Sequence, residues 1–355
     1  MQLTTTRVQP INEAKDPIER DGLALNAPQK TLIAGGVIAA ILLFVYLLAT
    51  QHISQPMLLG IGLLLGYTLF HARFGFTSAF RRMASVGKGQ AMRSHMLMLA
   101  IAVTLFAPIL AYGATFFGGP VAGYVSPVGV SLVVGAFIFG IGMQLGGGCA
   151  SGTLYAVGGG RTVMFVTLVF FIVGATIGAY HLPFWTEEMP AFEPVSLATS
   201  TGLGYGGAWL VSIALFGFIA WLTLVIEKKK KAPKMAPLPT EKGWKRIFRG
   251  SWPLFAAAIV LAVLNALTLM TRGTPWGITS AFALWGSKIA SAFGVDVASW
   301  GYWQGANAAS LQASIFTDST TVLNLGVIIG AFIASAAGGL FKFTKVTSGN
   351  ISASV

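Results

Sequence analysis

Long apolar runs recur along the whole chain of 355 residues and are separated by short polar segments. A helix that crosses a bilayer needs about 20 apolar residues, and about 17 is the usual lower bound. Seven runs satisfy this criterion, whereas the second is shorter and closer in length to a re-entrant segment. We therefore predict about eight membrane-spanning helices, at residues 31–50, 57–71, 95–112, 129–145, 162–181, 203–226, 251–271 and 320–341.

The composition supports this prediction. Hydrophobic residues make up 55% of the chain, the mean hydropathy is +0.74, and 10% of residues are charged, against about 25% in soluble domains. The single cysteine excludes a disulfide framework and a cysteine-cluster metal site, and the four histidines lack metal-ligand spacing. The sequence thus predicts an all-α integral membrane protein with no metal site.

Lysine and arginine lie almost entirely on one side of the predicted membrane. With the N-terminus inside, 21 of the 23 basic residues fall in inner segments, and Arg272 and Lys288 fall in outer ones. The net charge of +12 then divides into +15 inside and −3 outside. This asymmetry follows the positive-inside rule and predicts a cytoplasmic N-terminus. Anionic lipid accounts for the basic inner face, so we expect the lipid bilayer as a partner and no nucleic acid.

A short motif occurs twice, as FGFTSAF at 74–80 and WGITSAF at 276–282. Five of the seven positions are identical. The apolar runs before the two copies cross the membrane in opposite directions, so the copies face opposite ways. We therefore predict an inverted repeat of two pseudo-symmetric halves, with a binding site where the halves meet. Chance similarity in a chain rich in glycine and alanine is the alternative. The identical positions include Gly75 and Gly277, and Thr77 and Thr279.

The repeat suggests a division of the chain into four parts. A polar cytosolic tail at 1–30 precedes a first membrane half at 31–226, and a basic cytosolic loop at 227–250 leads to a second membrane half at 251–355.

The first half contains a glycine-rich stretch, GMQLGGGCASGTLYAVGGGR, at 142–161. Glycine costs about 1 kcal/mol relative to alanine inside a helix, so we expect the fourth span to break at 146–148 and a short helix to restart at Ala150–Val157. Non-helical backbone at membrane depth must be buried in protein or line a polar cavity. The N-terminus of the short helix would present free N–H groups to an anion, beside a partly accessible Cys149.

Simpler interpretations of these residues exist. A lone membrane cysteine often serves as a small packing residue, and glycines four residues apart often mark close helix packing. Arg73, beside the first motif, could attract anions or could face lipid headgroups.

The string LGGGCASGTLYAVGGGR resembles the Gly-Gly-Cys element of the YeeE/YedE family of sulfur-compound transporters, and ARFGFTSAFRRM resembles the first-repeat motif of that family. The resemblance implies an inverted-repeat membrane protein in which cysteines line a central path and pass thiosulfate along through S–H···S contacts. Cys149 corresponds to one such thiol. Gly75 stands at the position of a second, and a late Gly-Gly-Cys element is absent, so we expect the second half to end early.

The resemblance predicts transport of a small sulfur anion, with thiosulfate uptake across a bacterial inner membrane as the expected activity. It implies a transporter that is not an enzyme and has no cofactor and no catalytic residue. The expected substrate pathway comprises Cys149, Gly147, Gly148, Ser151, Gly152, Thr153, Gly75, Thr77, Gly277 and Thr279, with Arg73 attracting anions.

Energetics suggest a further partner. A dianion entering against the membrane potential costs about 4.6 kcal/mol per 100 mV, so we expect a cytosolic sulfur-carrier protein or sulfurtransferase to consume it. Two alternatives stay open: a membrane sulfurtransferase that uses Cys149 as a persulfide carrier, and a non-transporting accessory subunit.

Overall fold

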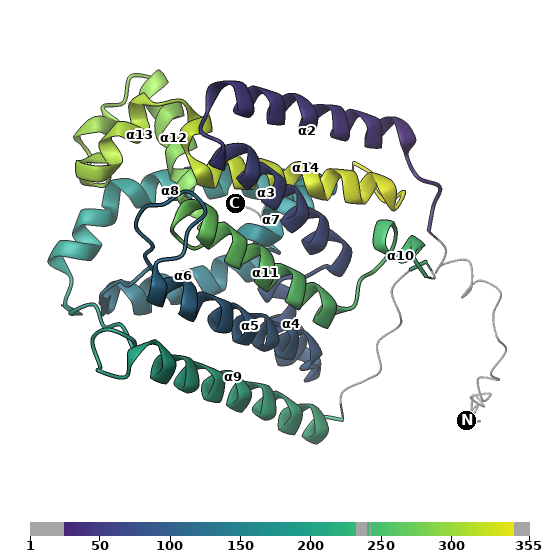
Figure 1. Ribbon diagram of the computed structural model, residues 1–355, viewed down its shortest axis with the longest axis horizontal. Coiled ribbons are helices and arrows are strands. Elements are labelled where there is room, and N and C mark those ends of the chain that lie inside the picture. Colours follow the sequence, from purple (N-terminus) through teal and green to yellow (C-terminus); the bar gives the residue numbers. More distant parts are fainter. Residues whose placement is uncertain (1–24, 232–239, 242, 344–355) are drawn as a thin grey trace, which may run out of the picture.

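The computed structural model describes residues 25–231, 240–241 and 243–343 (Figure 1). Most of the predicted tail at 1–30, and the chain after residue 343, lie outside the described residues. Eight helices within the described part are long and apolar enough to cross a membrane, as predicted. They contain α2 (Lys30–Thr50), α3 (Ser54–Ala72), α5 (Gln90–Tyr112), α6 (Val130–Leu145), α8 (Thr162–Pro183), α9 (Gly204–Lys229), α11 (Leu254–Arg272) and α14 (Ser319–Ala337). Three of the spans continue into the next helical element: the span of α3 to Val86, that of α6 to Gly158 and that of α8 to Glu188.

Short elements connect these helices. The two longest, α4 (Phe76–Val86) and α12 (Thr279–Ala292), begin within the two copies of the repeated motif. The remaining helices are α7 (Ala150–Gly158), α10 (Lys245–Phe248), α13 (Ala308–Gln312), the π-helix η1 (Phe184–Glu188) and the 3₁₀ turns η2 (Val297–Ser299), η3 (Gly301–Trp303), η4 (Gly305–Asn307) and η5 (Ile315–Thr317). Strands β1 (Val128–Gly129) and β2 (Ala191–Phe192) pair antiparallel.

The second span is a full-length helix rather than a re-entrant segment. Helix α3 contains 19 residues because the polar residues before the apolar run are also helical. Gln55, which is 8% exposed, donates a hydrogen bond of 2.8 Å to the carbonyl of Thr317. A buried amide with such a partner can lie inside the bundle, so the helix extends beyond the apolar run.

Helices α3 and α14 form the centre of the molecule and approach each other through glycines (Figure 1). Gly62 and Gly66 on α3 face Gly326 and Gly330 on α14. A Cβ on Gly66 would overlap the carbonyl oxygen of Val327, and a Cβ on Gly326 would lie 2.8 Å from the Cα of Gly62. Because membrane helices associate through close packing, these glycines allow a backbone contact that larger residues would prevent.

The helix pairing fits the predicted inverted repeat, which stays a prediction. Helices α3 and α11 each precede a copy of the repeated motif. Helix α3 packs against α14, whereas α11 packs against α5. A two-fold relation that exchanges α3 with α11 and α5 with α14 would exchange these two contacts.

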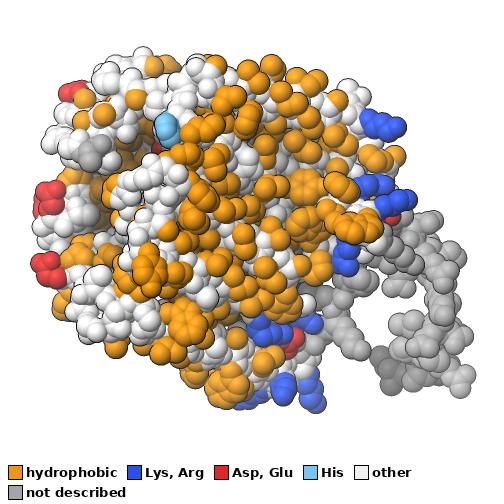
Figure 2. All heavy atoms as spheres, viewed as in Figure 1, with side chains coloured by type: hydrophobic (Ala, Val, Ile, Leu, Met, Phe, Trp, Pro, Cys, Tyr) orange, Lys and Arg blue, Asp and Glu red, His pale blue; other side chains and the backbone are white. Residues whose placement is uncertain are grey.

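The outer helices present apolar side chains to the surroundings. Helix α6 has no buried residue, and Val133, Phe137 and Ile138 on it are each at least 60% exposed. Figure 2 shows that hydrophobic side chains cover most of the visible face. In water such a surface would be unfavourable. The molecule is therefore a multi-pass membrane protein whose periphery contacts lipid.

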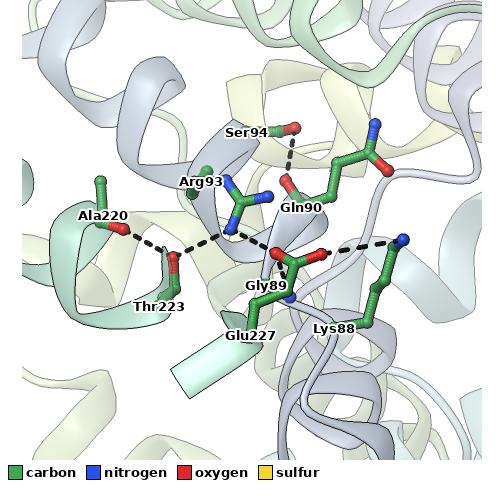
Figure 3. Close-up of polar contacts among 8 residues, drawn as sticks. All are labelled: Lys88, Gly89, Gln90, Arg93, Ser94, Ala220, Thr223 and Glu227. Atoms are coloured by element: carbon green, nitrogen blue, oxygen red, sulfur yellow. Dashed lines mark hydrogen bonds and ion pairs between the residues drawn. The ribbon is translucent and has the colours of Figure 1, made fainter. Parts of the chain in front are cut away.

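Charged side chains gather at the two ends of the bundle (Figure 2). Lysine and arginine cluster at the end that contains α10, and most visible carboxylates lie at the opposite end. At the basic end, Glu227 of α9 forms a 2.6 Å ion pair with Arg93 of α5 and lies 3.7 Å from the ammonium nitrogen of Lys88 (Figure 3). It also accepts a hydrogen bond from the backbone N–H of Gly89. This network attaches α9 to the turn between α4 and α5.

The glycine contact between α3 and α14 can be tested by adding a single methyl group. We expect Gly66→Ala to destabilise the protein by about 1–3 kcal/mol, the usual cost of overpacking, because the methyl group would overlap the Val327 carbonyl. Gly60→Ala on the same helix is the matched control, since a Cβ there meets no atom within 4 Å. Thermal unfolding in detergent measures both variants, and equal melting temperatures would contradict the prediction.

Candidate functional site

The glycine-rich stretch breaks the fourth span as predicted. Helix α6 ends at Leu145, and α7 begins at Ala150. Gly147 has φ +75°, a left-handed conformation in which a side chain is unfavourable. The restarted helix extends to Gly158, one residue beyond the prediction. The break therefore creates a helix N-terminus within the protein.

Cys149 is the N-cap residue of α7 and is more buried than the sequence analysis expected. Its exposed fraction is 7%, and its sulfur lies 3.5 Å from the hydroxyl oxygen of Ser151. A Cβ on Gly152 would lie 3.4 Å from the same sulfur. The thiol is therefore enclosed by its own helical turn, and Gly152 leaves the space that it occupies.

Two threonine hydroxyls near this turn are buried without a hydrogen-bond partner in the described part of the chain. Thr153 is 0% exposed, and Thr77 of the first motif is 4% exposed. A Cβ on Gly148 would lie 3.2 Å from the Thr153 hydroxyl oxygen, so this hydroxyl points at the glycine loop. An unsatisfied buried polar group costs about 1–3 kcal/mol. A polar ligand at the loop would remove that cost.

The first motif lies against the cysteine loop. A Cβ on Gly75 would lie 3.6 Å from the hydroxyl oxygen of Tyr155, a residue of α7. Arg81 of α4 donates hydrogen bonds to the side-chain oxygen and backbone carbonyl of Gln144, at 3.2 and 3.1 Å. The Gln144 amide in turn lies 3.5 Å from the Thr77 carbonyl. These contacts bring Gly75 and Thr77 together with the loop that contains Cys149.

Tyr155 was not among the predicted site residues. Its position six residues after Cys149 gives no functional signal, because a tyrosine in an apolar helix is more often an interfacial or packing residue. The structure places its hydroxyl opposite Gly75, and its side chain is close enough to Cys149 for electrostatic interaction.

Arg73 lies near Tyr155, on the side of the first motif. It is the C-cap of α3, with a left-handed φ of 48°, and it is exposed. Arg161, Arg82 and Tyr155 are within electrostatic range of its guanidinium group. In the described residues no carboxylate lies within ion-pair distance of Arg73, so this group of arginines leaves a positive charge near Tyr155.

The second motif lies in a separate cluster. A Cβ on Gly277 would lie 3.7 Å from the hydroxyl oxygen of Tyr124 and 3.9 Å from that of Ser280. The corresponding distances at Gly75 are 3.6 Å to Tyr155 and 4.0 Å to Ser78. Thr279 is exposed. The two glycines thus have closely similar surroundings, but Gly277 and Thr279 are not in the group around Cys149.

The fold and site define a class: multi-pass α-helical membrane proteins in which a broken helix holds polar groups inside the bundle. Within this class, the family described as sulphur transport matches residues 71–355, and the chain belongs to this family.

Named relatives agree with this assignment. The chain is 26% identical over 292 residues to thiosulfate transporter TsuA of Escherichia coli (strain K12), covering 79% of this chain and 74% of that protein. It is 30% identical over 173 residues to thiosulfate transporter TsuA of Spirochaeta thermophila, covering 47% and 49%. It is also 30% identical over 197 residues to probable transporter YedE of Escherichia coli, covering 54% and 44%. The chain spans about half the length of the last two proteins.

The burial of Cys149 predicts slow chemical modification. Since Cys149 is the only cysteine, maleimide labelling of the purified protein reports its exposure alone. We expect Gly147→Ala to accelerate labelling about 5–30-fold, because a left-handed conformation costs alanine about 1–2 kcal/mol and favours opening of the loop. Gly142→Ala, where a Cβ meets no atom within 4 Å, should label at the wild-type rate. Equal rates for all three proteins would contradict the burial.

Proposed function

We propose that this protein transports thiosulfate, or a closely related small sulfur anion, across the bacterial inner membrane. Membership of the sulphur transport family and the names of two relatives support this substrate. The observation that carries the proposal is the break between α6 and α7, where one thiol and the unpartnered Thr153 hydroxyl are buried together.

The loop offers contacts to both ends of a thiosulfate ion, its terminal sulfur atom and its oxygens. The Cys149 thiol is a weak donor that can contact the terminal sulfur atom. The Thr153 and Ser151 hydroxyls and the backbone amides of Gly147–Gly152 can donate to the oxygens. The N-terminus of α7 contributes a partial positive charge, which favours an anion at this position. A helix end buried in protein can provide this charge without exposing polar backbone to lipid.

The first motif continues this path toward the basic end. Tyr155 supplies a hydroxyl opposite Gly75, and Thr77 supplies a second buried hydroxyl without a partner. Arg73 attracts the anion electrostatically. The region around Gly277 and Thr279 would belong to the other half of the path. In this arrangement hydroxyl groups replace the thiols that the family resemblance implies at the other positions.

The charge distribution supports an orientation of the protein in the membrane. The clustering of lysine and arginine at one end supports a cytoplasmic location for that end and for the N-terminus (Figure 2). Uptake of a dianion costs about 4.6 kcal/mol per 100 mV. We therefore include in the proposal a cytosolic sulfur-carrier protein or sulfurtransferase that consumes the incoming anion.

Uptake of sulfur-labelled thiosulfate tests the proposed path, in cells that lack their own thiosulfate importers. We expect Cys149→Ala to abolish uptake. Thr153→Val should reduce uptake about tenfold or more, because hydrogen bonds to charged groups contribute about 1.5–3 kcal/mol. It should not lower the melting temperature, since this hydroxyl has no protein partner to lose and its unpaired burial is itself unfavourable.

Thr268→Val is the matched control. Thr268 is also 0% exposed, but its hydroxyl donates a 2.9 Å hydrogen bond to the Leu264 carbonyl within α11. We expect this variant to lose some stability and to retain uptake. Wild-type uptake by both Cys149→Ala and Thr153→Val would contradict the proposed path, and no uptake by correctly inserted wild-type protein would contradict the function.

The space at Gly75 allows a second test. Gly75 has φ −170°, an extended conformation that any residue adopts, and a Cβ there makes ordinary contacts of 3.6 and 4.0 Å. We expect Gly75→Cys to fold with an unchanged melting temperature and to transport thiosulfate at least as fast as the wild type. Gly66→Cys, which would overlap the Val327 carbonyl, should not fold stably. A large loss of stability in Gly75→Cys would contradict the geometry.

A further inference from the structure

A cluster of polar side chains surrounds Arg272 at the end of the molecule opposite the lysine-rich end. Four separate segments contribute to it: the end of α11, the loop before β1, the start of α12 and the start of α14. Arg272 donates a 3.2 Å hydrogen bond to the hydroxyl oxygen of Thr320. Ser280 donates to the same oxygen at 3.4 Å. The Tyr124 hydroxyl lies opposite Gly277, next to Ser280, and donates a 3.2 Å hydrogen bond to the Pro275 carbonyl.

The donors of this cluster outnumber its acceptors. Arg272 has five N–H groups, and the bond to Thr320 is its one hydrogen bond to the described residues. Thr320 is 1% exposed and its oxygen already accepts two hydrogen bonds, which leaves its own proton available for a further acceptor. The part of the chain that the structure describes contains no ion pair to Arg272.

The carboxylate of Asp318 does not accept a hydrogen bond from Arg272. Asp318 is within electrostatic range of Arg272, but its oxygens accept from the backbone N–H groups of Thr320 and Thr321 and from the Thr321 hydroxyl. It is therefore the N-cap of α14, where a carboxylate is stabilised by the helix dipole. The N-terminus of α12 has no side-chain cap and adds a further partial positive charge beside Ser280.

The cluster is rigidly built and accessible. Buried Asn324 of α14 donates a 3.0 Å hydrogen bond to the Ile278 carbonyl, and Trp285 donates to Thr321 at 2.9 Å, so α12 is fixed to α14. The loop that contains Tyr124 is attached to α11 by a 2.9 Å backbone hydrogen bond from Ala122 to Gly273. Ser280 itself is exposed. Rigid donors at an accessible position need little reorganisation to bind an anion.

We propose that Arg272, Thr320, Ser280 and Tyr124 form a second anion site that loads a small divalent oxyanion before it reaches Cys149. Arg272 supplies the charge and a planar set of N–H donors that matches two oxygens of one anion. The Thr320 hydroxyl proton supplies one further contact, and Ser280 and Tyr124 supply theirs by turning their hydroxyl protons away from Thr320 and from the Pro275 carbonyl. The identity of this anion as thiosulfate rests on the proposed transport function, whereas the site itself rests on the geometry.

Protection of an introduced cysteine tests binding without requiring transport. In a Cys149→Ala background, Ser280→Cys places the only thiol inside the cluster, and Ala298→Cys places an exposed reporter at the same end of the molecule. Maleimide labelling is measured in detergent without phospholipid, with and without thiosulfate. We expect thiosulfate to slow labelling at position 280 at least fivefold, and to leave labelling at position 298 unchanged.

Substitution of the arginine then identifies the cause of protection. Arg272→Gln should abolish protection at position 280, and Arg272→Lys should retain part of it, because lysine keeps the charge but loses the planar fork. Equal slowing at both reporters would show that thiosulfate merely consumes reagent and would overturn the proposed site. Protection that persists in Arg272→Gln would also overturn it, and so would protection by added phosphatidylglycerol but not by thiosulfate.

Uptake kinetics separate this inference from the proposed function. In the chain that retains Cys149, Arg272→Gln should raise the KM for thiosulfate at least tenfold and leave the maximal rate nearly unchanged. Uptake with a wild-type KM in Arg272→Gln would overturn the loading site while the transport function stands. Protection at position 280 in a protein that takes up no thiosulfate would overturn the transport function while the anion site stands.

Discussion

The close contact between α3 and α14 determines where every other part of the site lies. Gly62 and Gly66 meet Gly326 and Gly330 so closely that carbonyl oxygens of one helix occupy the space of absent side chains on the other. Helix α7 then lies across both helices. Its Gly158 packs against Ala331 of α14. If α3 and α14 were further apart, α7 would lose this support, and Cys149 would no longer lie beside the first motif.

A second constraint is the absence of water inside the bilayer. A broken helix is tolerated there because surrounding protein encloses its ends. In this molecule α3, α8 and α14 surround α7, and the turn at its start encloses a thiol and two hydroxyl-bearing residues. The same enclosure that stabilises the break also removes water from these groups. An anion that entered would therefore find a hydroxyl group, that of Thr153, with no hydrogen-bond partner in the described part of the chain.

The two copies of the repeated motif have similar surroundings, and each lies near positively charged arginine side chains. Each has a glycine opposite a tyrosine hydroxyl and a serine three residues later. The first copy lies near several arginines at the lysine-rich end. The second lies near Arg272, with Asp318 engaged by a helix N-terminus. In the proposed path, positive charge at both ends would lower the barrier for an anion to enter and leave.

Sequence alone determined the features that depend on local composition. Apolar length indicated eight spans, the glycines at 146–148 indicated a broken helix, and the lysine distribution indicated a polarised molecule, because each follows from the transfer of nearby residues between water and lipid. Tertiary structure decided the rest. The pairing of Tyr155 with Gly75 and of Tyr124 with Gly277, the enclosure of Cys149 and the cluster at Arg272 join segments that are distant in the chain. Such contacts depend on how whole helices pack, and helix packing is set by many small residues together rather than by any local pattern.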